Sequence, residues 1–260
     1  MRVFSFRHFR ILFLLILLIF VLIYTQEQKR ATTSWYQPVN VIIFPINGDQ
    51  HPATSSYINA LSADNFEDID AFFIRSSDDY DLAVEQPIIT ELGKEVEALP
   101  PSPPQKPGML SAAWWSLKLR YWAYRHTPDN VSNHNRIRLY VIYHQADKQG
   151  RLAHSLGLQK GLIGVIHAFA STRQNKQNAV VMAHEILHTL GATDKYGSDN
   201  RPDYPDGYAE PDKKPLYPQR YAEIMAGRIA INDNEARMPA SLRATRVGKL
   251  TASEINWLSP

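Results

Sequence analysis

The chain of 260 residues contains no cysteine. This absence excludes disulfide bonds, thiolate zinc sites and a cysteine nucleophile, so any metal ion would have to be bound by nitrogen and oxygen atoms. The chain also lacks an excess of charge of one sign, because its 28 basic and 26 acidic residues leave a net charge of only +2. Without a strongly positive surface, nucleic acid is not an expected partner.

A long apolar run does occur near the N-terminus. The run from Ile11 to Tyr24 carries no charge and follows three arginines. A bilayer span needs about 20 apolar residues and a cleaved secretion signal about 7 to 15, and either would export the rest of the chain. The sequence after Tyr24, TQEQKRATTSW, lacks the small-any-small pattern of a cleavage site. We therefore expect a transmembrane signal anchor over residues 11–25, with a buried core helix or a cleaved signal as alternatives.

The charges on either side of this run indicate its orientation. Three arginines precede it, whereas Lys29 and Arg30 after it are offset by Glu27. Because positive charge tends to stay on the cytoplasmic side, residues 1–10 are expected inside and the body in the periplasm or exterior. We expect a linker over residues 26–38 and one globular domain over residues 39–260. A separate subdomain over residues 39–108 is the alternative.

Hydrophobic patterning predicts a body that mixes strands and helices. The predicted strands are Val39–Ile46, Arg138–His144 and Gly161–Ala170. The predicted helices are residues 54–62, Met109–His126 and Asn178–Leu190. The aromatic-rich helix from Met109 to His126 is expected to be largely buried and to carry no chemistry. The predicted loops are acidic Asp64–Asp81, proline-rich Leu99–Gly108 and polar Lys195–Arg220. Aspartates in the first and last of these loops are an alternative site for Ca²⁺.

The predicted helix that ends at Leu190 has two faces. Six apolar residues recur at helical spacing and predict a stripe against a core: Ala179, Met182, Ala183, Ile186, Leu187 and Leu190. On the other side, His184 and His188 lie one turn apart, so their imidazoles can bind one tetrahedral zinc ion. Glu185 would point alongside that ion, where its carboxylate can take a proton from a water molecule.

The residues just after this helix strengthen the pattern. Gly191 can adopt the left-handed conformation that ends a helix sharply. The chain can then turn back so that Asp194 supplies a third metal ligand. Alternatively, Asp194 is only a turn residue, and the two histidines lie incidentally on an exposed helix face.

The segment HEILHTLGATD, His184 to Asp194, resembles the zinc motif of the metzincins, His-Glu-any-any-His-any-any-Gly-any-any-His, with aspartate replacing the last histidine as in snapalysin-like bacterial members. The sequence around Met225, AEIMAG, is similar to the methionine turn of that family. The resemblance covers about residues 136–260. It implies an α+β, zincin-like fold, in which a twisted mixed sheet packs on helices. It also implies an edge strand before the active-site helix, here Gly161–Ala170, and a C-terminal helix, here opened by the capping pair Thr251 and Glu254.

The resemblance implies a membrane-anchored zinc endopeptidase that acts on peptides or proteins. His184, His188 and Asp194 would hold one Zn²⁺, Glu185 would be the general base, and Met225 would lie beneath the metal. Plain core packing is the alternative for Met225. As in gluzincins, Glu210 or Glu223 is an alternative third ligand. The family's tyrosine after the methionine turn is missing here, which leaves three candidates for stabilising the oxyanion: Tyr196, Tyr217 and Tyr221.

Two other classes of function remain open at this point. One is a membrane-anchored protein that binds zinc without catalysis, and the other is a metal-free scaffold of the cell envelope. A structural zinc site has no use for a carboxylate beside the ion, so Glu185 favours the peptidase. The identity of the substrate cannot be predicted, because the residues that line its cleft are outside the motif.

Overall fold

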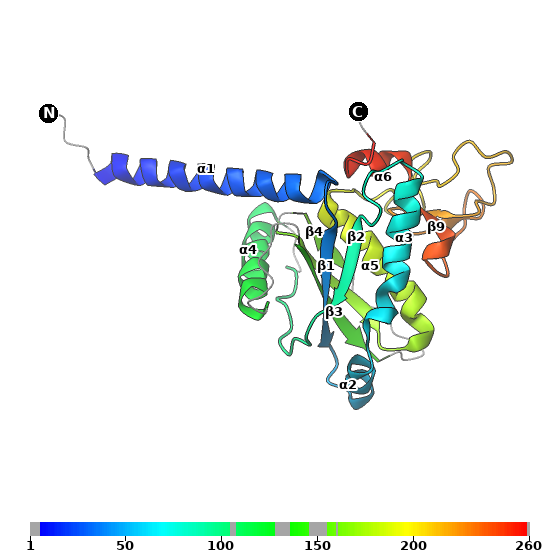
Figure 1. Cartoon of the computed structure of the whole chain (residues 1–260), viewed down its shortest axis with the longest axis horizontal. Helices are drawn as coiled ribbons and strands as arrows, with labels where there is room; N and C mark the ends of the chain where they lie inside the picture. Colours follow the sequence, from blue (N-terminus) through cyan, green and yellow to red (C-terminus); the bar gives the residue numbers. More distant parts are fainter. Residues whose placement is uncertain (1–5, 105–107, 128–135, 146–154, 160, 259–260) are drawn as a thin grey trace.

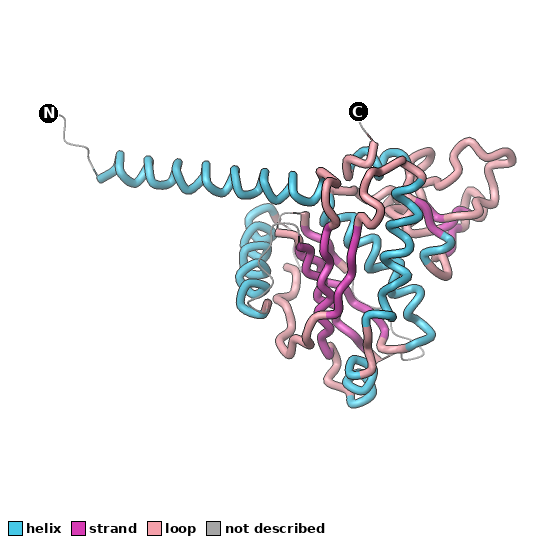
Figure 2. Tube along the Cα trace, viewed as in Figure 1, coloured by secondary structure: helices cyan, strands magenta, loops and turns pink. Residues whose placement is uncertain are grey.

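The structure, a computed structural model, describes residues 6–104, 108–127, 136–145, 155–159 and 161–258. Its architecture is α+β: in the described residues, six α-helices accompany a five-stranded mixed sheet of order β2-β1-β3-β5-β4 (Figures 1 and 2). The strands are β1 (Val39–Asn47), β2 (Ile88–Leu92), β3 (Arg136–His144), β4 (Leu156–Leu158) and β5 (Ile163–Phe169). Neighbouring strands run parallel except for β4, which lies antiparallel to β5 at one edge.

Helices cover both faces of the sheet. They are α1 (Phe6–Thr33), α2 (Pro52–Asn59), α3 (Glu67–Asp78), α4 (Met109–His126), α5 (Asn175–Leu190) and α6 (Lys249–Glu254). The short elements are η1 (Ala63–Phe66), η2 (Thr172–Gln174), β6 (Ala222–Glu223), β7 (Ile229–Ala230), β8 (Ala236–Arg237), η3 (Leu242–Ala244) and β9 (Thr245–Arg246). Val41 and Ile43 pack in the core that includes α3 and α5, whereas Ile42 and Phe44 pack in a second core with α4. Side chains alternate along a strand, and β1 is buried on both faces, which explains its continuous apolar run from Val41 to Ile46.

α1 projects from the body (Figure 1). It is long and apolar enough to cross a membrane, with a mean hydropathy of 2.4, and its apolar window makes no buried contact with the body. The helix continues into the expected linker as far as Thr33, and its C-terminal end is fixed because Thr32, Thr33 and then Trp35 are buried. Trp35 donates its indole N–H to the carbonyl of Ile255 at 2.7 Å. A single N-terminal helix of this kind is a candidate membrane anchor.

The prediction of a loop over Asp64–Asp81 is wrong, because α3 forms there. Ile69, Phe72 and Phe73 recur at helical spacing and are buried in the core shared with α5. Three of the acidic residues that indicated a solvated loop, Glu67, Asp68 and Asp70, occupy the first turn of the helix, where negative charge is favoured by the helix dipole. β1 and β2, the strands that precede and follow α3 in the chain, belong to the same sheet as β3 and β5.

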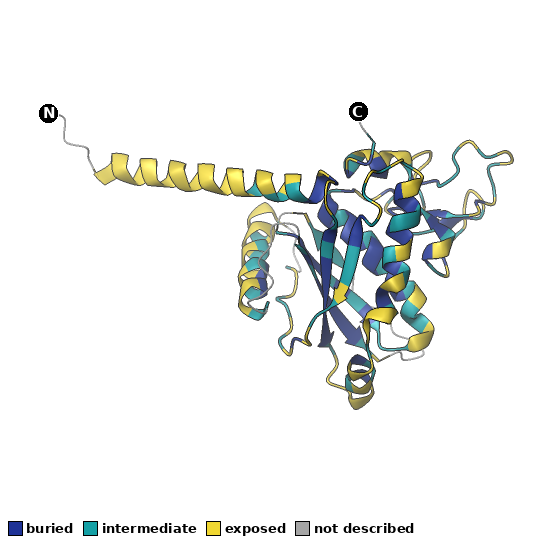
Figure 3. Cartoon of the chain, in the orientation of Figure 1, coloured by how far each residue is buried: buried dark blue, intermediate teal, exposed yellow. Residues whose placement is uncertain are grey.

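The prediction for α4 is right about the helix and wrong about its burial. Only Leu119 and Ala123 are buried, against the sheet. The residues on the other side, including Leu110, Trp114 and Tyr121, are exposed (Figure 3). Apolar residues recur on both sides of this helix, and the pattern alone did not show that only one side packs on the sheet.

Two expectations about the C-terminal half also need correction. β5 is not the edge strand, because β4 lies outside it. Thr251 and Glu254 are not a capping pair, because α6 begins at Lys249 after Gly248. Their side chains instead reach other segments: Thr251 donates to Glu223, and Glu254 accepts from Thr193. The strands predicted at Val39–Ile46 and Arg138–His144 and the helix at Asn178–Leu190 are confirmed within a few residues.

Candidate metal centre

α5 positions two imidazoles by burying its opposite face. All six residues of the predicted apolar stripe are buried, which confirms that this side of the helix packs on the core. The helix ends at Gly191, whose φ of 114° is left-handed as predicted. The N–H groups of Gly191 and Ala192 both bond back to the carbonyl of Leu187 at 3.0 Å. This turn brings the following residues back alongside the helix.

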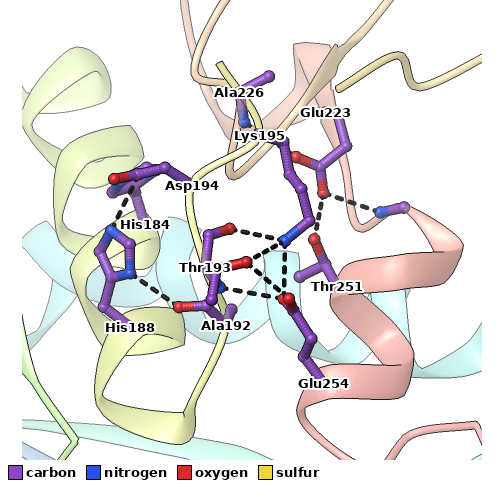
Figure 4. A network of polar contacts seen from close by, with 11 residues as sticks. His184, His188, Ala192, Thr193, Asp194, Lys195, Glu223, Ala226, Thr251 and Glu254 are labelled. Atoms are coloured by element: carbon purple, nitrogen blue, oxygen red, sulfur yellow. Dashed lines mark hydrogen bonds and ion pairs between the residues drawn. The ribbon is translucent and has the colours of Figure 1, made fainter. Parts of the chain in front are cut away.

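Asp194 meets both histidines after this turn (Figure 4). Its Oδ1 atom lies 3.3 Å from Nε2 of His184 and 3.1 Å from Nε2 of His188. Among the described residues, one group of three histidine or acidic side chains is close enough together to hold a metal ion. It consists of these three residues. Ligand atoms about 2.0–2.1 Å from a tetrahedral zinc ion lie about 3.3 Å from one another. The two distances from Oδ1 of Asp194 to the Nε2 atoms therefore fit three ligands of one zinc ion.

The protonation of the two rings also favours a cation. Nδ1 of His184 lies 3.0 Å from the carbonyl oxygen of Ile224, and Nδ1 of His188 lies 2.9 Å from that of Ala192. A carbonyl only accepts hydrogen bonds, so both Nδ1 atoms carry hydrogen and each neutral ring has its lone pair at Nε2. The two Nε2 lone pairs then converge with the carboxylate oxygen of Asp194. Positive charge must separate them, from a metal ion or from protons on the rings.

The close contact between Asp194 and the histidines shifts the pKa values of Asp194 and His188. Burial by itself would raise the pKa of Asp194, but its contacts with His184 and His188 outweigh burial and hold the pKa well below its usual range. Burial would lower the pKa of His188, but Asp194 and Glu185 outweigh burial and raise it. Without a metal, these two shifts favour an ion pair between Asp194 and a protonated His188. A divalent ion could replace the protons at the same positions, since metal binding requires the neutral imidazole.

Glu185 is buried beside the two imidazoles, with only 5% of its surface exposed. Its Oε2 atom is buried and has no hydrogen-bond partner among the residues that the structure describes. Burial raises the pKa of Glu185, more than the neighbouring histidines lower it. Burying a carboxylate oxygen is costly unless it is hydrogen-bonded, so Oε2 favours a polar partner such as a water molecule.

β4 closes the site on the side of Glu185. Gly157 in this strand lies so close to α5 that an added Cβ would be 2.6 Å from the carbonyl oxygen of Glu185 and 2.7 Å from Cβ of His188. The same atom would be 3.1 Å from Oε2 of Glu185. Only a residue without a side chain allows this approach. No signal in the sequence indicated this role for Gly157.

A polar network around buried Lys195 supports the turn that carries Asp194 (Figure 4). Lys195, only 4% exposed, donates from Nζ to Oε2 of Glu254 at 2.8 Å and to the carbonyl of Thr193 at 2.8 Å. The Thr193 hydroxyl bonds to Oε1 of Glu254 at 2.6 Å. The network holds the residues on both sides of Asp194 to α6. The sequence offered Glu254 only as a cap, because its partners are about 60 residues away.

The alternative glutamate ligands lie elsewhere. Glu223 is fully buried and accepts hydrogen bonds from the N–H of Ala226, the N–H of Gly248 and the hydroxyl of Thr251, at 2.9, 3.0 and 2.7 Å. Glu210 pairs with Arg220. Neither belongs to the group that includes His184 and His188.

The segment predicted as a methionine turn passes beside the histidines. Residues 224–226 form a turn in which the N–H of Ala226 bonds to the carbonyl of Glu223 at 3.1 Å. Met225 is buried in the core shared with α5. The preceding residue, Ile224, supplies the carbonyl that orients His184. The turn therefore contributes to the site through its backbone.

A cavity of about 360 Å³ opens beside Glu185. Val180, Val181, Tyr196 and Met238 contribute to its wall, together with His184 and Glu185. Tyr196 is the one of the three candidate tyrosines in this wall; Tyr217 bonds to Tyr208, and the ring of Tyr221 stacks under Arg246. Burial, with Asp194 next, raises the pKa of Tyr196, so its phenol keeps its proton at neutral pH. Its volume is within the range of pockets that bind small ligands.

His167 also lines this cavity and pairs with His144 on the neighbouring strand. Nε2 of His144 lies 3.0 Å from Nδ1 of His167, and the two rings stack. Burial lowers the pKa of both histidines, which favours neutral rings. The two rings therefore satisfy each other.

No protein-family model matches the chain, and comparison with curated proteins also finds no match.

Proposed function

We propose that the protein is a membrane-anchored zinc endopeptidase of the metzincin type. The observation that carries this proposal is the convergence of His184, His188 and Asp194 at the spacing of zinc ligands, with the buried and unpartnered carboxylate oxygen of Glu185 beside them. His184 and His188 would bind zinc through Nε2 and Asp194 through Oδ1. A zinc ion held there supplies Lewis acidity, which polarises a peptide carbonyl and acidifies water.

Each protein group then has a definite task. Glu185 takes the proton from the attacking water, and its raised pKa suits a group that must accept and later release a proton near neutral pH. The same carboxyl group delivers that proton to the leaving amine nitrogen as the peptide bond breaks. The Nδ1 hydrogen bonds to Ile224 and Ala192 keep the rings from turning. Tyr196, which lines the cavity beside Glu185, would donate a hydrogen bond to the oxyanion.

α1 supports the cellular part of the proposal. An unbroken helix from Phe6 to Thr33 with an exposed apolar surface would cross the bilayer once. The positive charges before it favour an N-terminus on the cytoplasmic side, and the body would then face the periplasm or exterior. Its substrates would then be exported or envelope peptides and proteins.

The Glu185→Gln variant tests the proposal. It preserves the size of the side chain and removes its ability to take a proton. We expect it to bind one zinc ion per chain, measured by elemental analysis, and to lose hydrolysis of a peptide library. A cleavage profile that is the same for this variant and the wild type would contradict the proposal. A wild-type protein that binds no zinc would contradict the metal site itself.

A further inference from the structure

The exposed side of α4 presents an apolar stripe to solvent. Five large residues recur at intervals of four and three, and form what is here called the outer face: Leu110, Trp114, Leu117, Tyr121 and Tyr124. Each is more than half exposed, from 54% for Leu117 to 86% for Leu110. This spacing aligns them along one side of the helix, opposite the buried Leu119 and Ala123. A contiguous stripe of five large, exposed apolar residues indicates a surface that contacts another molecule or a membrane.

The chemistry of the outer face is that of a membrane interface. Trp and Tyr dominate it, and these residues favour the boundary between lipid and water. Lys118 and Arg125 flank the stripe, and α4 contains no acidic residue. The Lys118 ammonium lies 5.5 Å from the centre of the Trp114 ring, so its apolar stem lies along the stripe. An apolar stripe with aromatic residues and basic flanks is typical of a helix that lies in the surface of an anionic bilayer.

The position of α4 relative to α1 agrees with this. In Figure 1, α4 flanks the body on the side from which α1 projects, and its axis runs across that of α1. Its exposed surface faces the direction of the N-terminus (Figure 3). If α1 crosses a bilayer, α4 therefore lies along the membrane surface with its outer face toward the lipid. A second copy of the chain fits less well, because pairing two outer faces would bring their basic flanks together.

We propose that the outer face of α4 is a second membrane contact, which inserts its aromatic residues among the headgroups of the bilayer that α1 crosses. This inference rests on the proposed anchor and is independent of the peptidase activity. α1 alone would leave the body free to rotate and tilt on its tether. A second contact at an angle to the first would hold the body in one orientation on the membrane.

The absence of cysteine makes this directly measurable, because a single introduced cysteine carries the only label. The full-length chain is reconstituted into phosphatidylcholine vesicles with phosphatidylglycerol, and a nitroxide is attached to Leu117→Cys on the outer face. Leu17→Cys in the apolar run and exposed Asn59→Cys in α2 are the membrane and water references. The measured quantity is the ratio of collision rates of the label with oxygen, which concentrates in lipid, and with a water-soluble nickel complex.

We expect the ratio at position 117 to lie several-fold above that at position 59 and below that at position 17. In a labelled Leu117→Cys chain that also carries Lys118→Glu and Arg125→Glu, the ratio at position 117 should fall toward that of the water reference. A ratio at 117 equal to that at 59, with 17 in lipid, would overturn the inference and leave the anchor intact. A water-like ratio at 17 would refute the anchor and the inference together. Spin–spin broadening at 117 that disappears on dilution with unlabelled protein would show a second copy on this face and would also overturn it.

Discussion

The ring of His184 is hydrogen-bonded through Nδ1 to the backbone carbonyl of Ile224, at 3.0 Å. The two residues come from α5 and from a turn 40 positions later in the chain. The bond selects the tautomer that leaves Nε2 free to bind a metal, and it holds the ring in place. Because the acceptor is a backbone atom, no side chain in the sequence marks it.

Replacing Asp194 with alanine is expected to weaken zinc binding. The variant loses the oxygen that lies closest to both Nε2 atoms and leaves a site with two ligands. Since loss of groups that only orient ligands costs about 10- to 100-fold, we expect loss of a ligand to cost at least about 100-fold in affinity. Competition with a chromophoric chelator measures it. Glu210→Ala is the control and should keep its zinc affinity. Loss of zinc in Glu210→Ala, with zinc retained in Asp194→Ala, would make Glu210 and not Asp194 the third ligand.

Replacing Gly157 in β4 with alanine is expected to displace Glu185 and His188 and so to lower activity. The added methyl group would press against the carbonyl of Glu185 and Cβ of His188. We expect a loss of about 1–3 kcal/mol in the free energy of unfolding and a larger proportional loss of peptide hydrolysis. Gly108→Ala is the control, because its methyl group would meet nothing closer than 3.4 Å. Unchanged kcat/KM in Gly157→Ala would show that β4 yields and does not constrain Glu185.

Replacing Glu254 with glutamine is expected to give a pH-dependent loss of stability. Burial would raise the pKa of Glu254, but hydrogen bonds from Lys195 and Thr193 outweigh burial and lower it. A carboxyl group whose pKa is lowered on folding adds stability above its unfolded pKa of about 4.3, and that stability is lost as pH falls through the folded pKa. We expect wild type to exceed the variant by about 1–3 kcal/mol at pH 7.

Denaturant unfolding at a series of pH values checks this result. The two proteins should converge as the pH falls below about 4, where the wild-type carboxyl group also becomes neutral. A difference that stays constant from pH 7 to pH 3.5 would mean that the effect of Glu254 is steric and not electrostatic.

Replacing Tyr196 with phenylalanine is expected to slow hydrolysis without weakening substrate binding. If the phenol donates to the oxyanion only in the transition state, its loss lowers kcat by about 100- to 1000-fold and leaves KM nearly unchanged. Tyr221→Phe is the control, because its ring is stacked with Arg246. An equal fall in both variants, or a change confined to KM in Tyr196→Phe, would exclude this role.

The parts of the site that the sequence predicted are local. His184, Glu185 and His188 are related by one helical turn, and the left-handed Gly191 follows from its place after the last apolar residue. The apolar stripe predicted which side of α5 would be buried, and the long N-terminal run predicted α1. Such inferences succeed because helical periodicity fixes the direction of side chains that are close in sequence.

The tertiary structure decided the relationships between distant segments. It selected Asp194 over Glu210 and Glu223 as the neighbour of the histidines, and it brought Gly157, Ile224 and Glu254 to the site from three other segments. It also left one side of α4 without a partner and buried α3, both against expectation. These outcomes depend on strand order, on turns and on which helix covers which face. Periodicity shows that a helix has an apolar side, but only the packing of the whole chain shows what that side meets.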